Sequence, residues 1–98
     1  MKNKIKDEKI DYLFKAILTL KDEKDCYDFF EDLCTVSELQ EMSKRLTAAK
    51  MLNENCIYTD IASSTGLSTA TISRVNRCLK YGSDGYVKVL KALGKEEK

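Results

Sequence analysis

Residues 61–75 read IASSTGLSTATISRV, and the spacing of their apolar and small residues is that of a helix-turn-helix. Gly66 follows Ala62 by four positions, and Ile72 and Val75 stand six and nine positions beyond the glycine. A small residue at 62 lets the second helix cross closely over the first, and a glycine at 66 supplies the positive φ of a tight turn. The residues expected to fill the wedge between the helices are Ile61, Leu67, Ile72 and Val75. Two helices that only pack together would reproduce parts of this pattern, so a structural helical hairpin is the alternative.

The second helix of this motif, near residues 68–80, has an outward side that is small, hydroxyl-bearing and basic. Ser68 or Thr69 is expected to cap it, with Ile72, Val75 and Leu79 facing inward. Small side chains let a helix enter a major groove, hydroxyls and arginines reach bases or phosphates, and the helix N-terminus offers unpaired N–H groups to a phosphate. The candidate DNA contacts on this helix are Ser68, Thr69, Ala70, Thr71, Ser73, Arg74 and Arg77. For any one of them alone, the alternative is a solvated helix face.

Three further amphipathic helices are expected before residue 53. Apolar residues recur at helical spacing over residues 10–18 and 26–33, and the polar run from Lys21 to Asp25 separates the two stripes. Asp25 is the expected cap of the second helix. The segment Thr35-Val36-Ser37-Glu38 has the T-x-x-E pattern of a capping box, which predicts a third helix from near Thr35 to about Leu52.

The fold class that these patterns predict is all-α, with about six helices. Residues 82–85 are expected to end the helix near 68–80 and to cap a closing helix over 83–93. The apolar residues of that closing helix are Tyr86, Val87, Leu90 and Leu93. We expect one helical domain over 1–98, with dimerisation helices in 1–53, the helix-turn-helix in 58–80 and the closing helix in 83–93. Dimerisation is expected because the upstream apolar stripes exceed what a small helix-turn-helix can cover.

Positive charge is concentrated where the helix-turn-helix lies. The formal net charge is +1, but residues 1–43 carry 7 Lys and 11 acidic residues, whereas residues 44–81 carry 6 Lys plus Arg and 2 acidic residues. A local basic excess is the electrostatic footprint of a surface that meets phosphates. Lys44 and Arg45, which open the basic segment, therefore join the candidate DNA contacts.

Composition disfavours several classes of function. The sequence has no histidine, and its four cysteines, at 26, 34, 56 and 78, form no C-x-x-C pair. These residues show no recognisable zinc set, and a Ser/His or Cys/His nucleophile cannot be assembled without histidine. No enzyme and no metal or other cofactor is therefore expected, and the thiols should be reduced and mostly buried. The charged N-terminus MKNKIKDEKIDY lacks an apolar signal core and no apolar run reaches spanning length, which predicts a cytoplasmic protein with no membrane partner.

The run Ala70-Thr71-Ile72-Ser73-Arg74, followed by Asn76 and Leu79-Lys80, resembles the recognition helix of the Trp repressor family. It is closest to the YerC/YecD-type relatives of that family among Gram-positive bacteria, and the resemblance extends upstream through Lys44-Arg45 to cover residues 10–93. The resemblance implies an intertwined all-helical homodimer whose two recognition helices face successive major grooves of double-stranded DNA. It also implies a transcriptional regulator that acts as a repressor.

The same resemblance raises the question of an effector. In the Trp repressor two arginines sandwich the indole of the tryptophan corepressor, and Arg45 and Arg74 match those positions as a candidate effector pocket. A glycine follows the second arginine in that repressor, whereas Val75 stands there in this chain. Overfilling a snug site costs about 1–3 kcal/mol or more, which argues against tryptophan as corepressor. A ligand of another shape stays open, and phosphate is the plainer ligand for both arginines.

Two hypotheses of function follow. The first is a dimeric, sequence-specific DNA-binding regulator. The second is a helical protein–protein interaction module whose helix-turn-helix does not bind DNA and whose acidic first half docks a basic partner. DNA binding through Arg74 and Arg77 should depend steeply on salt, whereas a hydrophobic protein interface should not.

Overall fold

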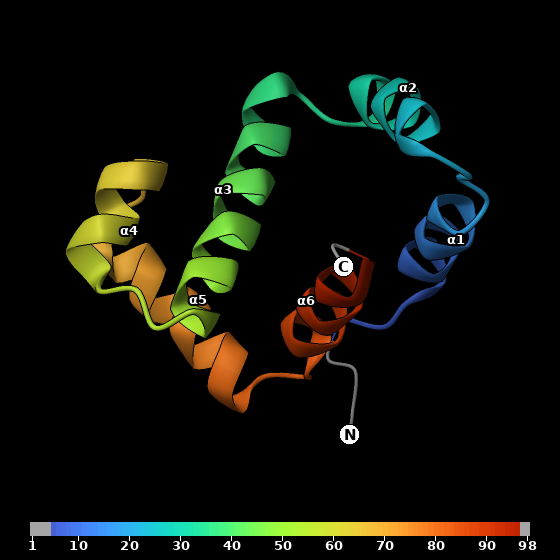
Figure 1. Ribbon diagram of the computed structural model, residues 1–98. Coiled ribbons are helices and arrows are strands. Elements are labelled where there is room, and N and C mark those ends of the chain that lie inside the picture. Colours follow the sequence, from blue (N-terminus) through green and yellow to red (C-terminus); the bar gives the residue numbers. More distant parts are fainter. Residues whose placement is uncertain (1–4, 97–98) are drawn as a thin grey trace. The chain divides into compact units, whose positions relative to one another are not determined.

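The computed structural model describes residues 5–96, and over that range the chain forms six α-helices and no strand (Figure 1). The first four residues of the charged N-terminal stretch lie outside the described range. The helices are α1 (Glu8–Ile17), α2 (Glu23–Leu33), α3 (Val36–Asn53), α4 (Tyr58–Thr65), α5 (Thr69–Tyr81) and α6 (Gly85–Glu96). The expected all-α class with about six helices is confirmed.

The chain divides into two compact units, Met1–Leu39 and Gln40–Lys98. The first unit contains α1, α2 and the first turn of α3, and the second contains the rest of α3 and α4 to α6. Neither α1 nor α2 has a buried residue. Among the described residues, the buried apolar side chains all belong to the second unit and are Ala48, Ala49, Ile61, Leu67, Ile72 and Val75. The hydrophobic core of the single chain is therefore built around the helix-turn-helix.

Side-chain caps start the helices of the first unit. The T-x-x-E expectation is confirmed, because Thr35 Oγ1 accepts the Glu38 N–H at 3.0 Å and a Glu38 carboxylate oxygen accepts the Thr35 N–H at 2.9 Å. The expected cap of the second helix is wrong: Asp22, and not Asp25, caps α2 by accepting the Asp25 N–H at 2.9 Å. Asp25 instead accepts the Lys21 N–H at 3.1 Å. Both aspartates can accept such bonds, and the residue spacing alone does not choose between them.

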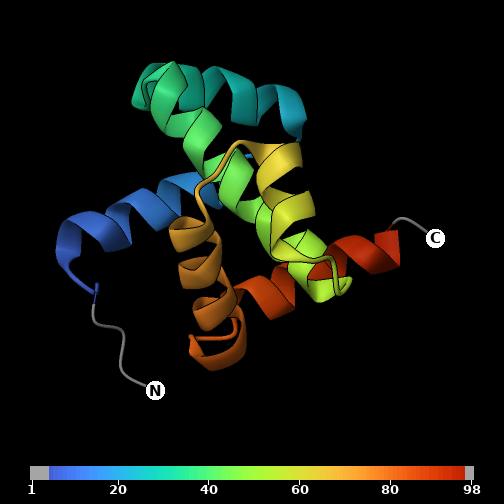
Figure 2. The same ribbon diagram turned by 90° about the vertical axis from the view of Figure 1, so that its left-hand side faces the viewer.

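The helix-turn-helix has the predicted geometry. α4 ends at Gly66, whose φ of 77° is left-handed and whose N–H donates to the Ala62 carbonyl at 2.8 Å. The side chain of Ser68 caps α5 by accepting the Thr71 N–H at 3.1 Å. All four residues expected in the wedge are buried: Ile61, Leu67, Ile72 and Val75. Figure 2 shows the short connection between α4 (yellow) and α5 (orange).

The end of α5 and the start of α6 also follow the predicted turn. Gly82 follows the last turn of α5, where a Cβ atom would overlap the carbonyl oxygen of Cys78. This contact requires glycine, although the φ of Gly82 is not positive. Tyr86 and Leu90 of α6 pack against the core, while Val87 and Leu93 are exposed in the single chain. The closing helix therefore covers the core with only part of its apolar face.

Candidate nucleic-acid interface

The outward face of α5 carries the residues expected to meet DNA. Burial of Ile72 and Val75 fixes how the helix is rotated about its own axis. The predicted contacts Ser68, Thr69, Ala70, Ser73, Arg74 and Arg77 are then exposed, and Thr71 is half-buried. A surface of small and basic side chains on α5 is therefore accessible to an external partner. The major groove of DNA is wide enough to admit such a helix.

Two hydroxyls at the N-terminus of α5 are not equivalent. The Oγ atom of Ser68 accepts the Thr71 N–H and also lies 3.1 Å from Thr71 Oγ1. Because the Ser68 hydroxyl serves as the helix cap, its freedom to reach a base is limited. Thr69 and Ser73 are the exposed serine and threonine residues of α5 itself, and neither caps the helix, so their hydroxyls are freer to meet an external partner.

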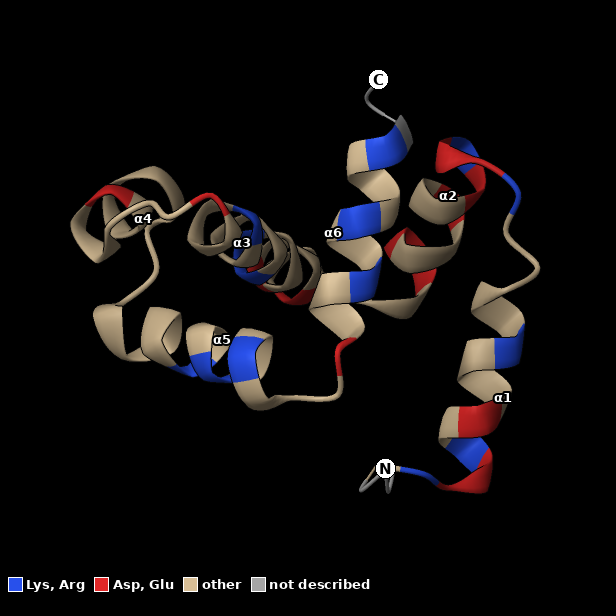
Figure 3. Cartoon of the chain, turned by 60° about the horizontal axis from the view of Figure 1, so that its bottom comes forward, with Lys and Arg blue, Asp and Glu red and all other residues tan. Residues whose placement is uncertain are grey.

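The charges of α5 are all positive. Figure 3 shows Lys and Arg on α5 and no acidic residue, whereas α1 and α2 carry both signs. Within residues 5–96 the recorded ion pairs are Lys6–Asp11 and Lys24–Asp28, each 2.9 Å, and both lie in the first unit. The cations of α5 are therefore not neutralised by carboxylates of the described chain. Such cations can release counterions from a DNA backbone on binding.

Arg45 of α3 and Arg74 of α5 line one hollow of about 310 Å³. Its other lining residues are Thr71, Val75, Cys78 and Tyr86. The structure thus brings together the two arginines of the candidate effector pocket, while Lys44 is exposed and does not line the hollow. The volume lies at the lower end of the range for small-molecule pockets, and two guanidinium groups favour an anionic occupant.

Val75 belongs to both the core and the wall of this hollow. Its side chain is 3 % exposed and packs in the cluster that contains Ile61 and Ile72. A glycine at this position would remove that packing and enlarge the hollow that the two arginines line. The valine therefore couples the shape of the hollow to the packing of the helix-turn-helix.

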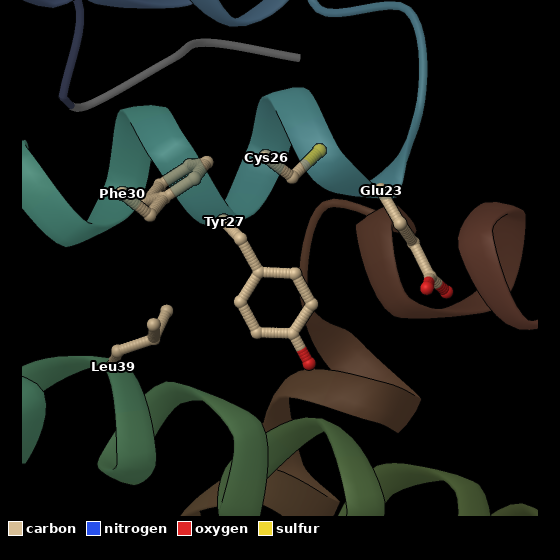
Figure 4. Close-up of a pocket in the computed structure, with 5 residues that line it drawn as sticks. All are labelled: Glu23, Cys26, Tyr27, Phe30 and Leu39. Atoms are coloured by element: carbon tan, nitrogen blue, oxygen red, sulfur yellow. The ribbon is translucent and has the colours of Figure 1, made fainter.

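The first unit has a hollow of its own, of about 280 Å³. Glu23, Cys26, Tyr27 and Phe30 of α2 line it together with Leu39 (Figure 4). In Figure 4 Leu39 points toward Phe30, and the carboxylate of Glu23 lies away from these two side chains. The lining of this hollow is largely apolar, so the hollow fits an apolar side chain.

The thiols and the membrane expectation can be compared with the structure directly. The expectation of mostly buried thiols is wrong for the single chain, because Cys26 and Cys78 are exposed and Cys34 and Cys56 are half-buried. Cys26 and Cys78 line hollows, which residue type alone does not reveal.

No helix in the described part of the chain is long and apolar enough to cross a membrane. The described residues also contain no group of three or more Cys, Asp or Glu side chains arranged to hold a metal ion.

The sequence patterns did not indicate three residues of this region. Cys78 and Tyr86 line the hollow beside the arginines, and Thr65 lies buried at the end of α4. The spacing of Cys78 four residues after Arg74 places both on one side of a helix and was a usable signal. Tyr86 reaches the hollow from another helix, and no pattern in the sequence indicates that contact.

Comparisons with known proteins agree with this geometry. The family model described as Trp repressor protein matches residues 8–94. The uncharacterized protein YerC of Bacillus subtilis (strain 168) is 52% identical over 84 residues, which cover 86% of this chain and 81% of that protein.

Two solved structures are similar over nearly the whole chain. The crystal structure of a TrpR-like protein from Eubacterium eligens ATCC 27750 has a TM-score of 0.89 and 56% identity, and covers 95% of this chain and 96% of its own. The crystal structure of a Staphylococcus aureus protein proposed to be a Trp repressor has a TM-score of 0.87 and 47% identity. The match covers 93% of this chain and 91% of that protein's chain. The recognition helix, the fold and the matched length lead to one conclusion: the chain belongs to the Trp repressor protein family.

Proposed function

We propose that this protein is a sequence-specific DNA-binding transcriptional regulator that acts as a repressor. The observation that carries the proposal is the outward face of α5, where small, hydroxyl and arginine side chains are exposed without any acidic neighbour on the helix. Membership in the Trp repressor family supports a DNA-binding regulator and not an enzyme. The helix near 68–80 enters the major groove with its N-terminal half toward the bases.

The contacts divide into two groups with different roles. Thr69, Ala70 and Ser73 read base edges, since they are small and exposed on the side of α5 opposite the core. Arg74 and Arg77 contact mainly phosphates, together with Lys44 and Arg45 from α3. Ser68 and Thr71, whose hydroxyls lie 3.1 Å apart at the N-terminus of α5, hold this end of the helix close to the phosphate backbone of the DNA.

The working form is a homodimer. Apolar side chains of the first unit are exposed in the single chain, with Leu18 at 82% and Phe14 at 47%, and a second copy would cover them. Two-fold symmetry then places the two recognition helices at half-sites about 34 Å apart, one turn of the double helix.

The test is binding to a randomised duplex library at several salt concentrations, with Ser73→Ala and Arg77→Ala beside the unmodified protein. Ser73→Ala should change the preferred sequence, with a cost of roughly 1–3 kcal/mol at the affected base pair. Arg77→Ala should weaken all sequences about equally and reduce the salt slope by about 0.9 for each lost phosphate contact.

The opposite result is equally definite. If both variants stay folded and leave affinity, sequence preference and salt slope unchanged, this surface does not read DNA. The alternative of a protein-interaction module then takes its place, with the apolar hollow at Tyr27 and Phe30 as its first candidate surface.

We also propose that Arg45 and Arg74 serve phosphate and not tryptophan. Val75 occupies core volume beside the two guanidinium groups, and an indole between them would compete with its side chain. Calorimetry should detect no tight tryptophan binding to the unmodified protein, and Val75→Gly is the variant in which weak binding is expected. Val75→Ala controls for loss of packing, because it shortens the side chain without introducing glycine. Tight binding to the unmodified protein would overturn the steric argument.

A further inference from the structure

The turn of the helix-turn-helix contains a buried hydroxyl group that the DNA contacts do not use. Thr65 is the last residue of α4 and is 8% exposed. Its Oγ1 atom donates to the Ile61 carbonyl at 2.7 Å and accepts the Leu67 N–H at 3.2 Å. One side chain therefore joins the last turn of the first helix to the first residue after Gly66.

The bond to Leu67 replaces a backbone bond that a glycine-ended helix often makes. In a Schellman turn the second residue past the helix end donates its N–H back to a carbonyl of the last turn. Here Gly66 N–H donates to Ala62, and within residues 5–96 the N–H of Leu67 has only the Thr65 hydroxyl as its acceptor. Leu67 is itself buried, so its N–H cannot turn to water without moving its side chain out of the core.

The position of Leu67 determines the direction in which α5 begins. It packs with Ile61 and Ile72 in the core, and Ser68 caps α5 directly after it. A shift in the Leu67 backbone would move the first turn of α5, which carries the proposed base readers Thr69 and Ala70. Phosphate contacts from the long arginine and lysine side chains tolerate such a shift far better than contacts from short side chains to base edges.

We propose that the Thr65 hydroxyl is a positioning group for sequence discrimination: it holds α5 at the angle that lets its short side chains reach the bases. This inference rests on the proposed DNA-binding function. It predicts that loss of the hydroxyl lowers binding to the preferred sequence while leaving general binding to DNA intact.

The experiment compares Thr65→Val, which keeps the branched shape and removes the hydroxyl, with Thr65→Ser, which keeps the hydroxyl. Each protein is bound to the duplex that the unmodified chain selects from a randomised library and to a scrambled duplex of the same composition. Thr65→Val should reduce the ratio of the two affinities roughly tenfold, with an unchanged salt slope, and Thr65→Ser should restore most of the ratio. Amide hydrogen exchange at Leu67 should be faster in Thr65→Val and near normal in Thr65→Ser.

The outcomes separate this inference from the function on which it rests. If the unmodified chain selects no duplex, the DNA-reading function fails and the role of Thr65 in it fails too. If a duplex is selected and folded Thr65→Val keeps the full affinity ratio, only the role of Thr65 is overturned. That role is also overturned if both affinities fall by the same factor, since that is what general destabilisation produces.

Discussion

The two units of the chain differ in how they cover their apolar side chains. In the second unit the helix-turn-helix buries Ile61 and Ile72 completely, and α3 adds Ala48 and Ala49. In the first unit α1 and α2 have amphipathic stripes but no buried residue, and Leu18 is almost fully exposed. The second unit thus has a core of its own, whereas the first lacks one in the single chain. The proposed DNA-reading surface therefore lies on helices that pack around a core, while the apolar faces upstream are exposed in the single chain.

The formal charge of the chain changes sign close to the boundary between the two units. Residues 1–43 have a formal excess of acidic over basic residues, and residues 44–81 have the reverse. The ion pairs found in the described chain occupy cations of the first unit only. The free cations therefore accompany the packed core, and their field is not cancelled locally.

The largest expected effect comes from the apolar face of α1. Phe14→Ala should lower the free energy of unfolding by about 3 kcal/mol or more if a second copy buries the ring, since that is the usual cost of removing a buried Phe. The unfolding midpoint of the unmodified protein should also rise with protein concentration. Lys9→Ala, an exposed change on the same helix, is the control. A stable folded monomer in micromolar sedimentation experiments would contradict the dimer.

The next effect concerns two glycines with different backbone conformations, Gly66 with a positive φ and Gly94 within helix α6. Gly66→Ala should destabilise the fold by about 1–2 kcal/mol, because alanine is strained at a φ of 77° although no atom obstructs its Cβ. Gly94→Ala in α6 should stabilise by about 1 kcal/mol, because glycine is a poor helix former and its site is also open. Chemical denaturation of both variants gives the comparison, and equal shifts of the same sign would refute it.

A smaller effect separates the charges of the two units. Lys44→Ala should weaken DNA binding and lower the salt slope by about 0.9 per contact, whereas Lys24→Ala should leave the slope unchanged. Lys24 already pairs with Asp28, and it lies in the acidic part of the chain. Titrations at four salt concentrations measure both slopes. Equal slopes for the two variants would remove Lys44 from the phosphate contacts.

The smallest effect is the pH dependence of the α3 cap. The backbone N–H of Thr35, followed by its hydroxyl, lowers the pKa of Glu38 below its ordinary value of 4.5. Because the pKa of Glu38 is lower in the folded state, its carboxylate stabilises the fold at pH values above the ordinary pKa. This stabilisation is lost as the pH falls through the folded pKa. Glu38→Gln keeps an acceptor for the cap but does not titrate. As the pH is lowered from 7 to 3, the free energy of unfolding should therefore decrease less for Glu38→Gln than for the unmodified protein. Parallel curves would contradict this role of Glu38.

Local sequence patterns were sufficient to predict the helices and the motif. The spacing of Ala62, Gly66, Ile72 and Val75 predicted the turn and the buried wedge, because only one rotation of each helix buries all the apolar positions. The T-x-x-E cap at Thr35 was equally local, since both of its bonds join residues three apart. The cap of α2 was misplaced because two aspartates of the same type stand three residues apart and either can accept an N–H.

Contacts between side chains of different helices depended instead on tertiary packing. Arg45 and Arg74 share a hollow with Tyr86 because α3, α5 and α6 bring them there, and no periodicity within one helix encodes that contact. Thr65 combines the two cases: its hydrogen bonds to Ile61 and Leu67 are local, because they join residues four and two positions apart, whereas the burial of its side chain depends on packing. Helix periodicity is a property of neighbouring residues, whereas the shape of a hollow and the burial of a side chain depend on how separate helices pack, and packing is a property of the whole fold.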